Sequence, residues 1–208
     1  MLETTAFKGA QPLTDITISN PLTGFEKLGF ELNQIRKIKD ALDISAGVII
    51  VAGFIMDGKT TTIAHMMQMF DEIGSRPVTE LQYSIDIKNL IHIQLELNAF
   101  QKYVVSDDFD EAREFMLRLP PKSVIVVGNL LGDKMDLSFH FMLVENGHLV
   151  ITELSACSIE QLKQKLLETN PRECLKKNVS AIIMQNLRTF ETTPTLKATI
   201  YGAGEITF

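Results

Sequence analysis

The spacing of hydrophobic residues along the chain alternates between two patterns, which predict strands and helices in turn. Short apolar or alternating runs are typical of strands, and apolar residues three or four positions apart are typical of amphipathic helices. The predicted strands are residues 48–52, 77–81, 90–97, 123–128 and 148–152, with a closing pair at 197–201 and 205–208. The predicted helices are residues 31–42, 60–70, 107–119, 134–145, 159–167 and 171–187.

Strands that alternate with helices predict an α/β fold in which helices flank a mostly parallel sheet. A ligand would then lie at the carboxyl ends of the strands. The N-terminal segment is rich in Thr, Pro, Gly and Asn, so we expect a linker or edge strand over residues 1–28. One domain is expected over residues 29–208, because a 208-residue chain with 45% hydrophobic residues buries a single large core.

Residues 53–60 carry the most informative motif of the sequence. Their letters, GFIMDGKT, match the phosphate-binding loop G-x-x-x-x-G-K-[ST]. They stand between a predicted strand and a predicted helix, as such a loop requires. The alternative is a glycine-bracketed turn with a surface lysine, but the flanking elements favour a nucleotide site.

Each position of this loop has a chemical reason. Gly53 and Gly58 allow backbone conformations in which consecutive N–H groups surround phosphate oxygens at a helix N-terminus. Lys59 would neutralise the β and γ phosphates, and Thr60 would offer its hydroxyl to Mg²⁺. The implied cofactors are ATP and Mg²⁺. The candidate nucleotide contacts are Gly53, Asp57, Gly58, Lys59, Thr60 and Thr61.

Charge and cysteine content narrow the partners and the compartment. The net charge of −6 argues against nucleic acid or an anionic membrane as the main partner. Cys157 and Cys174 lack metal-type spacing and are expected as reduced thiols, with a disulfide between them as the alternative. No apolar stretch approaches the roughly 20 residues of a membrane span, and the signal-peptide pattern is missing. We therefore expect a cytoplasmic protein.

The histidines offer no second metal site. His92 and His140 have no further ligand at metal-binding spacing, which leaves Thr60 as the candidate metal ligand. His65 stands beside Met66, Met67 and Met69, and these methionines are expected to form a core stripe. We expect His148 to be structural.

Several segments, taken in order, resemble the nucleotide-binding domain of the PilT-like type II and type IV secretion and pilus ATPases. They are residues 28–30, the phosphate loop with its extra threonines, and residues 123–128, 146–150 and 185–188 with the end hairpin. The resemblance covers residues 28–208, and only the phosphate loop is specific by itself. It implies a RecA-like P-loop core with a C-terminal β-hairpin.

The departures from that family concern hydrolysis. Asn129 stands where the family has a catalytic glutamate, and an amide cannot accept a proton from water at neutral pH. Of the family's acidic segment only Glu80 remains. A family histidine falls on Ser155, and of an arginine-aspartate pair only Asp133 is retained. The sequence therefore supports nucleotide binding more strongly than turnover.

Two carboxylates could replace the missing one. Glu153 follows the predicted strand 148–152, whose carboxyl end should border the γ-phosphate, and Glu80 would approach from the predicted strand 77–81. We hypothesise that one of them orients the attacking water; otherwise both are ordinary strand-end residues. The candidate catalytic positions are Glu153, Glu80 and Asn129.

The resemblance implies an ATP-binding motor domain that moves a filament or a secreted substrate. It implies a ring hexamer, or an assembly with a related ATPase, at the inner-membrane machinery of a secretion or pilus system. The alternative is a catalytically degenerate paralogue that binds nucleotide and regulates an active motor. A small-molecule kinase is a third possibility, which would need an arginine-bearing lid.

Overall fold

The computed structural model describes residues 21–73, 78–83, 91–92, 102–103, 114, 117–119, 122–127, 135–188 and 195–208. Within these ranges the helices are α1 (Pro21–Leu28), α2 (Leu32–Leu42), α3 (Lys59–Ile73), α5 (Ser138–Glu145), α6 (Ile159–Thr169), α7 (Arg172–Asn178) and the 3₁₀ turn η1 (Ala203–Glu205). The strands are β1 (Gly47–Gly53), β2 (Val78–Tyr83), β3 (Ile91–His92), β4 (Lys102–Tyr103), β5 (Val124–Val127), β6 (Leu149–Ser155), β7 (Val179–Arg188) and β8 (Thr195–Gly202). Helices and strands alternate, which confirms the predicted α/β class.

The strands form one mostly parallel sheet in the order β3-β2-β5-β6-β1-β7-β8, with β4 also paired to β2. Strands β4, β2, β5, β6, β1 and β7 run parallel to one another, whereas β3 is antiparallel to β2 and β8 is antiparallel to β7. Strand β1 lies between β6 and β7, and all seven of its residues are buried. The loop that follows β1 therefore leaves the sheet at the carboxyl edge, where α/β proteins bind ligands.

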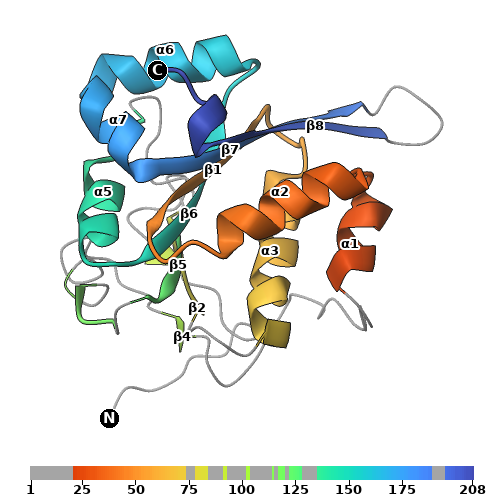
Figure 1. The fold of residues 1–208 in the computed structure, drawn as a ribbon, viewed down its shortest axis with the longest axis horizontal. Coiled ribbons are helices and arrows are strands. Elements are labelled where there is room, and N and C mark those ends of the chain that lie inside the picture. Colours follow the sequence, from red (N-terminus) through yellow and green to blue (C-terminus); the bar gives the residue numbers. More distant parts are fainter. Residues whose placement is uncertain are drawn as a thin grey trace.

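Helices cover both faces of this sheet, as Figure 1 shows. Alternate residues of β1 point to opposite faces. Ile50 belongs to the core that includes residues of α5, α6 and α7, and Ile49 belongs to the core that includes residues of α1, α2 and α3. The core on the side of α5, α6 and α7 is called the first core, and the core on the side of α1, α2 and α3 the second. The predicted methionine stripe of α3 is confirmed, because Met66, Met67 and Met69 are all buried in the second core. Burial of β1 on both faces fixes the start of the phosphate loop.

The helix predicted over residues 171–187 is wrong beyond its first turns. Helix α7 ends at Asn178, and β7 begins at Val179 and pairs with β1 and β8. A strand that is buried on both faces carries a continuous apolar run, here residues 181–184, and its pattern resembles that of a buried helix.

The predicted C-terminal hairpin exists, but one of its two strands was misplaced. The hairpin pairs β7 with β8, from Ala181 opposite Gly202 to Arg188 opposite Thr195. Residues 205–208, predicted as the second strand, form no strand, and Phe208 instead buries its ring in the first core. Figure 1 shows the hairpin reaching past α1 and α2.

The N-terminal prediction needs a correction as well. Residues 21–28 were expected as linker or edge strand, but they form α1, with Pro21 at its first position, where the missing N–H costs no helical hydrogen bond. Phe25 is fully buried, and its ring meets Phe30 edge to face at 5.4 Å. Helix α1 is thus part of the packed core. Residues 1–20, and most of the elements predicted at 90–97 and 107–119, lie outside the described residues.

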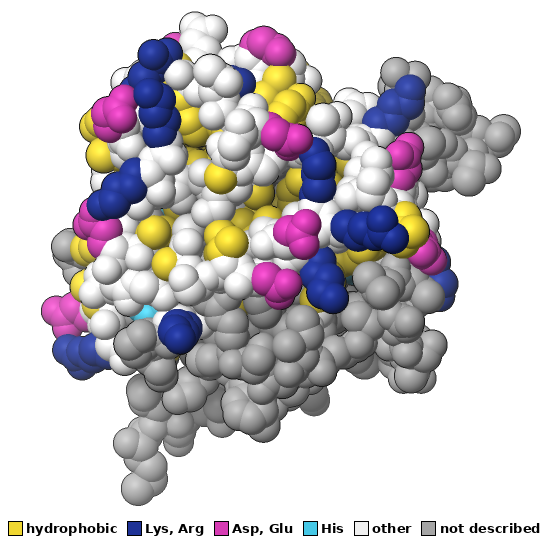
Figure 2. All heavy atoms as spheres, viewed as in Figure 1, with side chains coloured by type: hydrophobic (Ala, Val, Ile, Leu, Met, Phe, Trp, Pro, Cys, Tyr) yellow, Lys and Arg dark blue, Asp and Glu magenta, His cyan; other side chains and the backbone are white. Residues whose placement is uncertain are grey.

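Both cysteines are free thiols, as expected, so the alternative disulfide between Cys157 and Cys174 does not form. On the face drawn in Figure 2, basic and acidic side chains intermingle. Exposed ion pairs such as Lys37 with Glu205 at 2.8 Å and Lys177 with Glu145 at 3.3 Å illustrate this mixing. None of the helices described above combines the length and apolar character that a bilayer crossing demands.

Candidate functional site

The phosphate loop connects β1 to α3 in the conformation that its glycines permit. Gly58 has a φ of 79°, a left-handed conformation that favours glycine. A Cβ atom on Gly53 would lie 2.5 Å from the backbone oxygen of Gln185 on β7. Glycine at position 53 therefore lets β1 and β7 approach closely just where the loop begins. The N–H of Thr62 donates to the oxygen of Gly58 at 3.0 Å, so helical hydrogen bonding starts directly after the loop.

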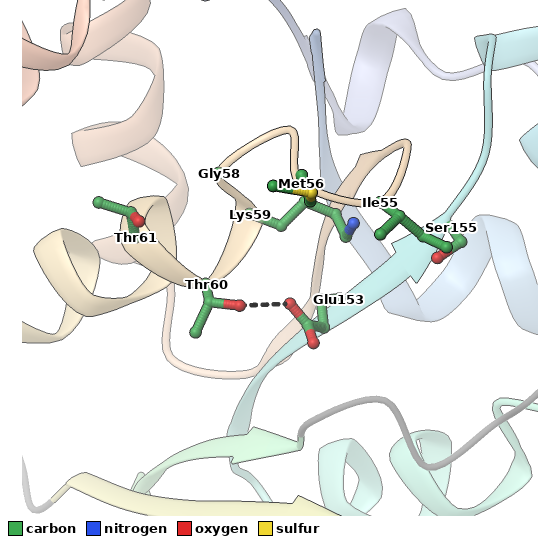
Figure 3. Close-up of a pocket in the computed structure, with 8 residues that line it drawn as sticks. All are labelled: Ile55, Met56, Gly58, Lys59, Thr60, Thr61, Glu153 and Ser155. Carbon is green, nitrogen blue, oxygen red and sulfur yellow. Dashed lines mark hydrogen bonds between the residues drawn. The ribbon is translucent and has the colours of Figure 1, made fainter. Parts of the chain in front are cut away.

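The two polar side chains at the start of α3 face a neighbouring strand and the loop itself. Thr60 Oγ1 donates to Glu153 Oε2 at 3.1 Å, across from the end of β6 (Figure 3). Lys59 Nζ donates to the backbone oxygen of Phe54 at 2.8 Å. The ammonium group is thus held at the loop by a backbone oxygen. Glu153, which the sequence predicted at this edge of the sheet, lies beside Thr60.

A cavity of about 430 Å³ opens in front of these groups. This volume falls within the range of small-molecule sites. Its lining residues come from the loop, the first turn of α3 and the end of β6: Ile55, Met56, Gly58, Lys59, Thr60, Thr61, Glu153 and Ser155. Figure 3 shows Lys59, Thr60 and Glu153 converging on this space. An ammonium, a hydroxyl and a carboxylate around one cavity suit a phosphate group accompanied by a divalent cation.

The side chain of Asp57 is turned away from this cavity. Asp57 is buried, and its carboxylate accepts the N–H of Phe54 at 2.6 Å and the N–H of Leu187 at 3.0 Å. Its backbone oxygen accepts a hydrogen bond from Gln185 Nε2 at 2.5 Å. The main-chain N–H of Asp57 donates to the oxygen of Phe54 at 3.2 Å, and its side chain ties the loop to β7. The partners on β7, Gln185 and Leu187, lie 128 and 130 positions away, so no local pattern could predict them.

The middle of the loop is apolar and exposed. Phe54, Ile55 and Met56 are 56%, 68% and 87% exposed. Met56 also has a φ of 69°, a conformation that costs a non-glycine residue on the order of 1–2 kcal/mol. The loop thus holds a strained residue next to the cavity, and strain of this kind is found at functional sites.

Of the other predicted site residues, some lie on more distant strands and some lie outside the described residues. Glu80 lies on β2, with its backbone opposite Val126, and strands β5 and β6 separate β2 from β1. Asn129 and Asp133 lie outside the described residues, so their predicted positions stay predictions. Ser155, which stands where the family has a histidine, lines the cavity. The structure therefore brings one of the two candidate carboxylates, Glu153, to the phosphate loop.

Behind Glu153, a buried histidine supports β6. His140 Nε2 lies 3.2 Å from Thr152 Oγ1, and burial lowers the pKa of His140 to about 4. The imidazole is therefore neutral at physiological pH, and its role is structural. The described residues contain no cluster of three or more His, Cys, Asp or Glu side chains that could hold a metal ion. A Mg²⁺ ion here would rely on Thr60, water and phosphate oxygens, which agrees with the few protein ligands that this ion takes.

Fold and site together define a class. A phosphate loop between a buried parallel strand and a helix, with another strand inserted between β1 and β5, is the arrangement of RecA-like P-loop nucleotide-binding domains. Comparison with known families then identifies the relatives. Residues 16–195 match the family described as type II/IV secretion system protein, and the chain belongs to that family.

Solved structures of secretion ATPases share the fold. The chain superposes on the ATPase DotB of Legionella pneumophila with a TM-score of 0.63 and 18% identity, over 85% of this chain and 50% of that one. DotB of Yersinia pseudotuberculosis gives 0.62 and 16%, over 86% and 48%. The VirB11 ATPase of Brucella suis, solved with sulphate, gives 0.53 and 18%, over 90% and 58%.

This chain therefore spans about half the length of these solved relatives. Among curated proteins, none matches the sequence significantly. At these identities the likeness to solved structures establishes the fold, and the family match establishes the kind of protein.

Proposed function

We propose that this chain is an ATP-binding and ATP-hydrolysing motor domain of a type II/IV secretion or type IV pilus system. The observation that carries the proposal is the convergence of Lys59, Thr60 and Glu153 on one cavity at the carboxyl edge of the sheet. Family membership supplies the biological setting, because the matching family consists of secretion system proteins. The activity of the complete motor is part of this proposal.

Binding of the triphosphate would rest on the loop. Main-chain N–H groups at the start of α3 point toward the anion, and the positive end of the helix dipole favours it. Lys59, now bonded to the oxygen of Phe54, would turn its ammonium to the β and γ phosphates. The hydroxyl of Thr60 would release Glu153 and bind the cation. Mg²⁺, when bound, supplies positive charge that offsets the charge of the phosphates.

We propose that Glu153 is the carboxylate that orients the attacking water. Strand β6 lies directly beside β1, with Glu153 opposite Val51, so its end borders the loop. The carboxylate lies within hydrogen-bond reach of Thr60, the residue nearest the expected cation. A carboxylate can accept a proton from water, whereas the amide of Asn129 cannot. In the family, the catalytic glutamate stands at the position of Asn129, after β5. Here Glu153 would supply the carboxylate from β6.

The setting of the motor follows from the same relatives. The DotB and VirB11 proteins are named as ATPases, and VirB11 as part of a type IV secretion system. We propose that this chain works in a ring hexamer, or with a related ATPase, at the inner-membrane machinery of such a system. Nucleotide would lie between subunits, and hydrolysis would move domains against one another.

A second function deserves a test because of Asn129. A chain that lacks the family's glutamate could bind nucleotide tightly and regulate an active motor without hydrolysing ATP. Binding requires the loop, Lys59, Thr60 and Mg²⁺, whereas hydrolysis also requires an oriented water. The two functions therefore predict equal affinity and different turnover.

Calorimetry and single-turnover hydrolysis together test both functions. Titration with MgATP should release heat, and Lys59→Ala should weaken binding by about ten- to a hundredfold, since it removes charge-assisted hydrogen bonds. The exposed-helix variant Lys39→Ala serves as the matched control. Hydrolysis of bound ATP in one turnover supports the motor, and tight binding without turnover, even with partner subunits, supports the regulator. No heat with any nucleoside triphosphate would exclude both.

A further inference from the structure

Asp57 holds the phosphate loop onto a distant strand. One oxygen of its carboxylate accepts the N–H of Phe54 within the loop at 2.6 Å, and the other accepts the N–H of Leu187 on β7 at 3.0 Å. Gln185 Nε2, also on β7, donates to the backbone oxygen of Asp57 at 2.5 Å. Both Asp57 and Gln185 are buried. Together with the hydrogen bond from its own N–H to the oxygen of Phe54 at 3.2 Å, four hydrogen bonds therefore fix residue 57 from both sides.

A carboxylate is an unexpected side chain in a loop that binds phosphate. A negative charge inside a loop that receives phosphates disfavours the ligand, unless the charge is turned away and its lone pairs are occupied. Asp57 satisfies both conditions, because its two oxygens face N–H groups of Phe54 and Leu187. The N–H of Phe54 is thereby taken up by Asp57 and is not offered to phosphate. The carboxylate thus shapes the loop and is not a ligand for phosphate.

The hydrogen bond between Asp57 and Leu187 connects the phosphate loop to the hairpin of β7 and β8. Leu187 lies near the end of the paired region, opposite Leu196 on β8. Helix α2 holds β8 in turn, because Gln34 Nε2 donates to the oxygen of Ala198 at 2.6 Å and Lys37 Nζ to the oxygen of Ile200 at 3.3 Å. A displacement of the loop at Asp57 would therefore displace the hairpin. A displacement of the hairpin would likewise displace the loop.

The amide of Gln185 leaves one buried polar atom of this junction unpaired within the part of the chain that the structure describes. Its Oε1 atom is buried and has no hydrogen-bond partner among the described residues. A buried acceptor without a partner destabilises its own arrangement. A second arrangement of the loop, in which an N–H group meets Oε1, would remove that cost. Ligand binding to the loop amides is an event that could drive such a change.

We propose that Asp57 is a positioning residue that couples occupancy of the phosphate loop to the β7–β8 hairpin. The ligand is the nucleotide, so this inference rests on the proposed function. In the free protein, the carboxylate holds the loop and Leu187 together. A ligand that shifts the loop changes the hydrogen bond to Leu187, and by reciprocity a partner that moves the hairpin changes the affinity for nucleotide.

The variant Asp57→Ser should keep the hydrogen bond from Phe54 and remove the one from Leu187. A serine hydroxyl can still accept the N–H of Phe54, three residues before it, but it has no second oxygen for Leu187. Asp57→Asn keeps one acceptor and serves as a second variant if Asp57→Ser does not fold. The matched control is Asp43→Ser, which alters an exposed aspartate after α2.

Amide hydrogen exchange of Leu187, followed by NMR with and without MgADP, tests the coupling. In the wild-type chain MgADP should change the exchange rate of the Leu187 amide by about fivefold or more, the lower end of typical couplings between sites. In Asp57→Ser this amide should exchange faster without ligand and should no longer respond to MgADP. Asp57→Asn should give an intermediate response, and Asp43→Ser should behave as the wild type.

Calorimetry on the same samples separates this proposal from the function on which it rests. Heat of MgADP binding with an unresponsive Leu187 amide in the wild-type chain would overturn the coupling and leave the proposed function standing. An unchanged response in Asp57→Ser would likewise overturn it, because Asp57 would then not be the link. No heat from any nucleotide would overturn the proposed function and the coupling together.

Discussion

Thr60 Oγ1 donates a hydrogen bond to Glu153 Oε2 at 3.1 Å, and this contact joins the first turn of α3 to the end of β6. Strand β6 lies between β1 and β5 in the sheet. The carboxylate at the site therefore comes from the strand next to the phosphate loop. This placement explains how a chain with Asn129 could still present an acid to the phosphates.

Glu153→Gln should separate binding from chemistry. The amide keeps the size of the side chain and accepts the hydrogen bond from Thr60, so MgATP affinity should change little. It cannot accept a proton, so single-turnover hydrolysis should fall by about a hundred- to ten-thousandfold. Rapid-quench measurement of ADP formation gives the rate, and calorimetry gives the affinity.

The matched control for this prediction is Glu173→Gln. Glu173 lies on α7, which precedes the amino end of β7, whereas the phosphate loop lies at the carboxyl edge of the sheet. Its turnover should equal that of the parent chain. Hydrolysis at the parent rate in Glu153→Gln would remove Glu153 from the mechanism and direct attention to Glu80.

Gly53→Ala should loosen the loop from β7. The added Cβ would lie 2.5 Å from the backbone oxygen of Gln185 and 3.1 Å from Asp57 Oδ2, so the backbone must shift. We expect a loss of about 1–3 kcal/mol in the free energy of unfolding, as for an overpacked core, together with weaker nucleotide binding. Gly204→Ala is the control, because no atom lies within 4 Å of its added Cβ. Equal urea midpoints for the two variants would contradict the close approach of β1 and β7.

Met56→Gly should stabilise the loop or leave its stability unchanged. Relief of the left-handed conformation at φ 69° contributes about 1–2 kcal/mol, and the greater freedom of glycine in the unfolded chain offsets about half of it. Ile55→Gly is the matched comparison, since Ile55 is also exposed and has no positive φ. That variant should lose roughly 0.5–1 kcal/mol, the ordinary cost of glycine. Urea unfolding of the two proteins measures both effects, and the opposite ranking would contradict the strain at Met56.

The phosphate loop could be placed from sequence because its motif and its flanking elements are local. Strand β7 could not, because the cores on the two sides of the sheet bury both of its faces, with Ile182 in one core and Ile183 in the other, and leave a continuous apolar run without alternation. The β-branched residues Val179, Ile182 and Ile183 favour a strand, and they were the available signal.

The contacts that complete the site depend on strand order, which the pattern of one sequence does not contain. Glu153 and Thr60 are 93 positions apart, and Leu187 and Asp57 are 130 positions apart. Glu153 was nevertheless predicted, because it directly follows a predicted strand and strand ends gather at one edge. The role of Asp57 was missed, because the orientation of a loop side chain is decided by its distant partners.

The stability of the fold should depend on pH through His140. This residue is fully buried on α5, and burial lowers its pKa from 6.5 to about 4 in the folded protein. As the pH falls from about 6.5 to about 4, the unfolded chain binds a proton that the folded protein excludes, so the free energy of unfolding decreases by up to about 3 kcal/mol. Below about pH 4 both states are protonated, and this contribution stops changing.

His140→Gln isolates that contribution, because glutamine does not titrate. Asp136 is the charged group near His140, and its hydrogen bonds from Ser138 lower the pKa of Asp136. Asp136 begins to bind a proton only as the pH falls below about 4, so its effect on stability is separable from that of His140. Urea unfolding at about pH 7 and about pH 5 should show the wild type losing about 2 kcal/mol more than His140→Gln. Equal losses in the two proteins would mean that His140 accepts a proton in the folded state, and that β6 is not supported by a neutral imidazole.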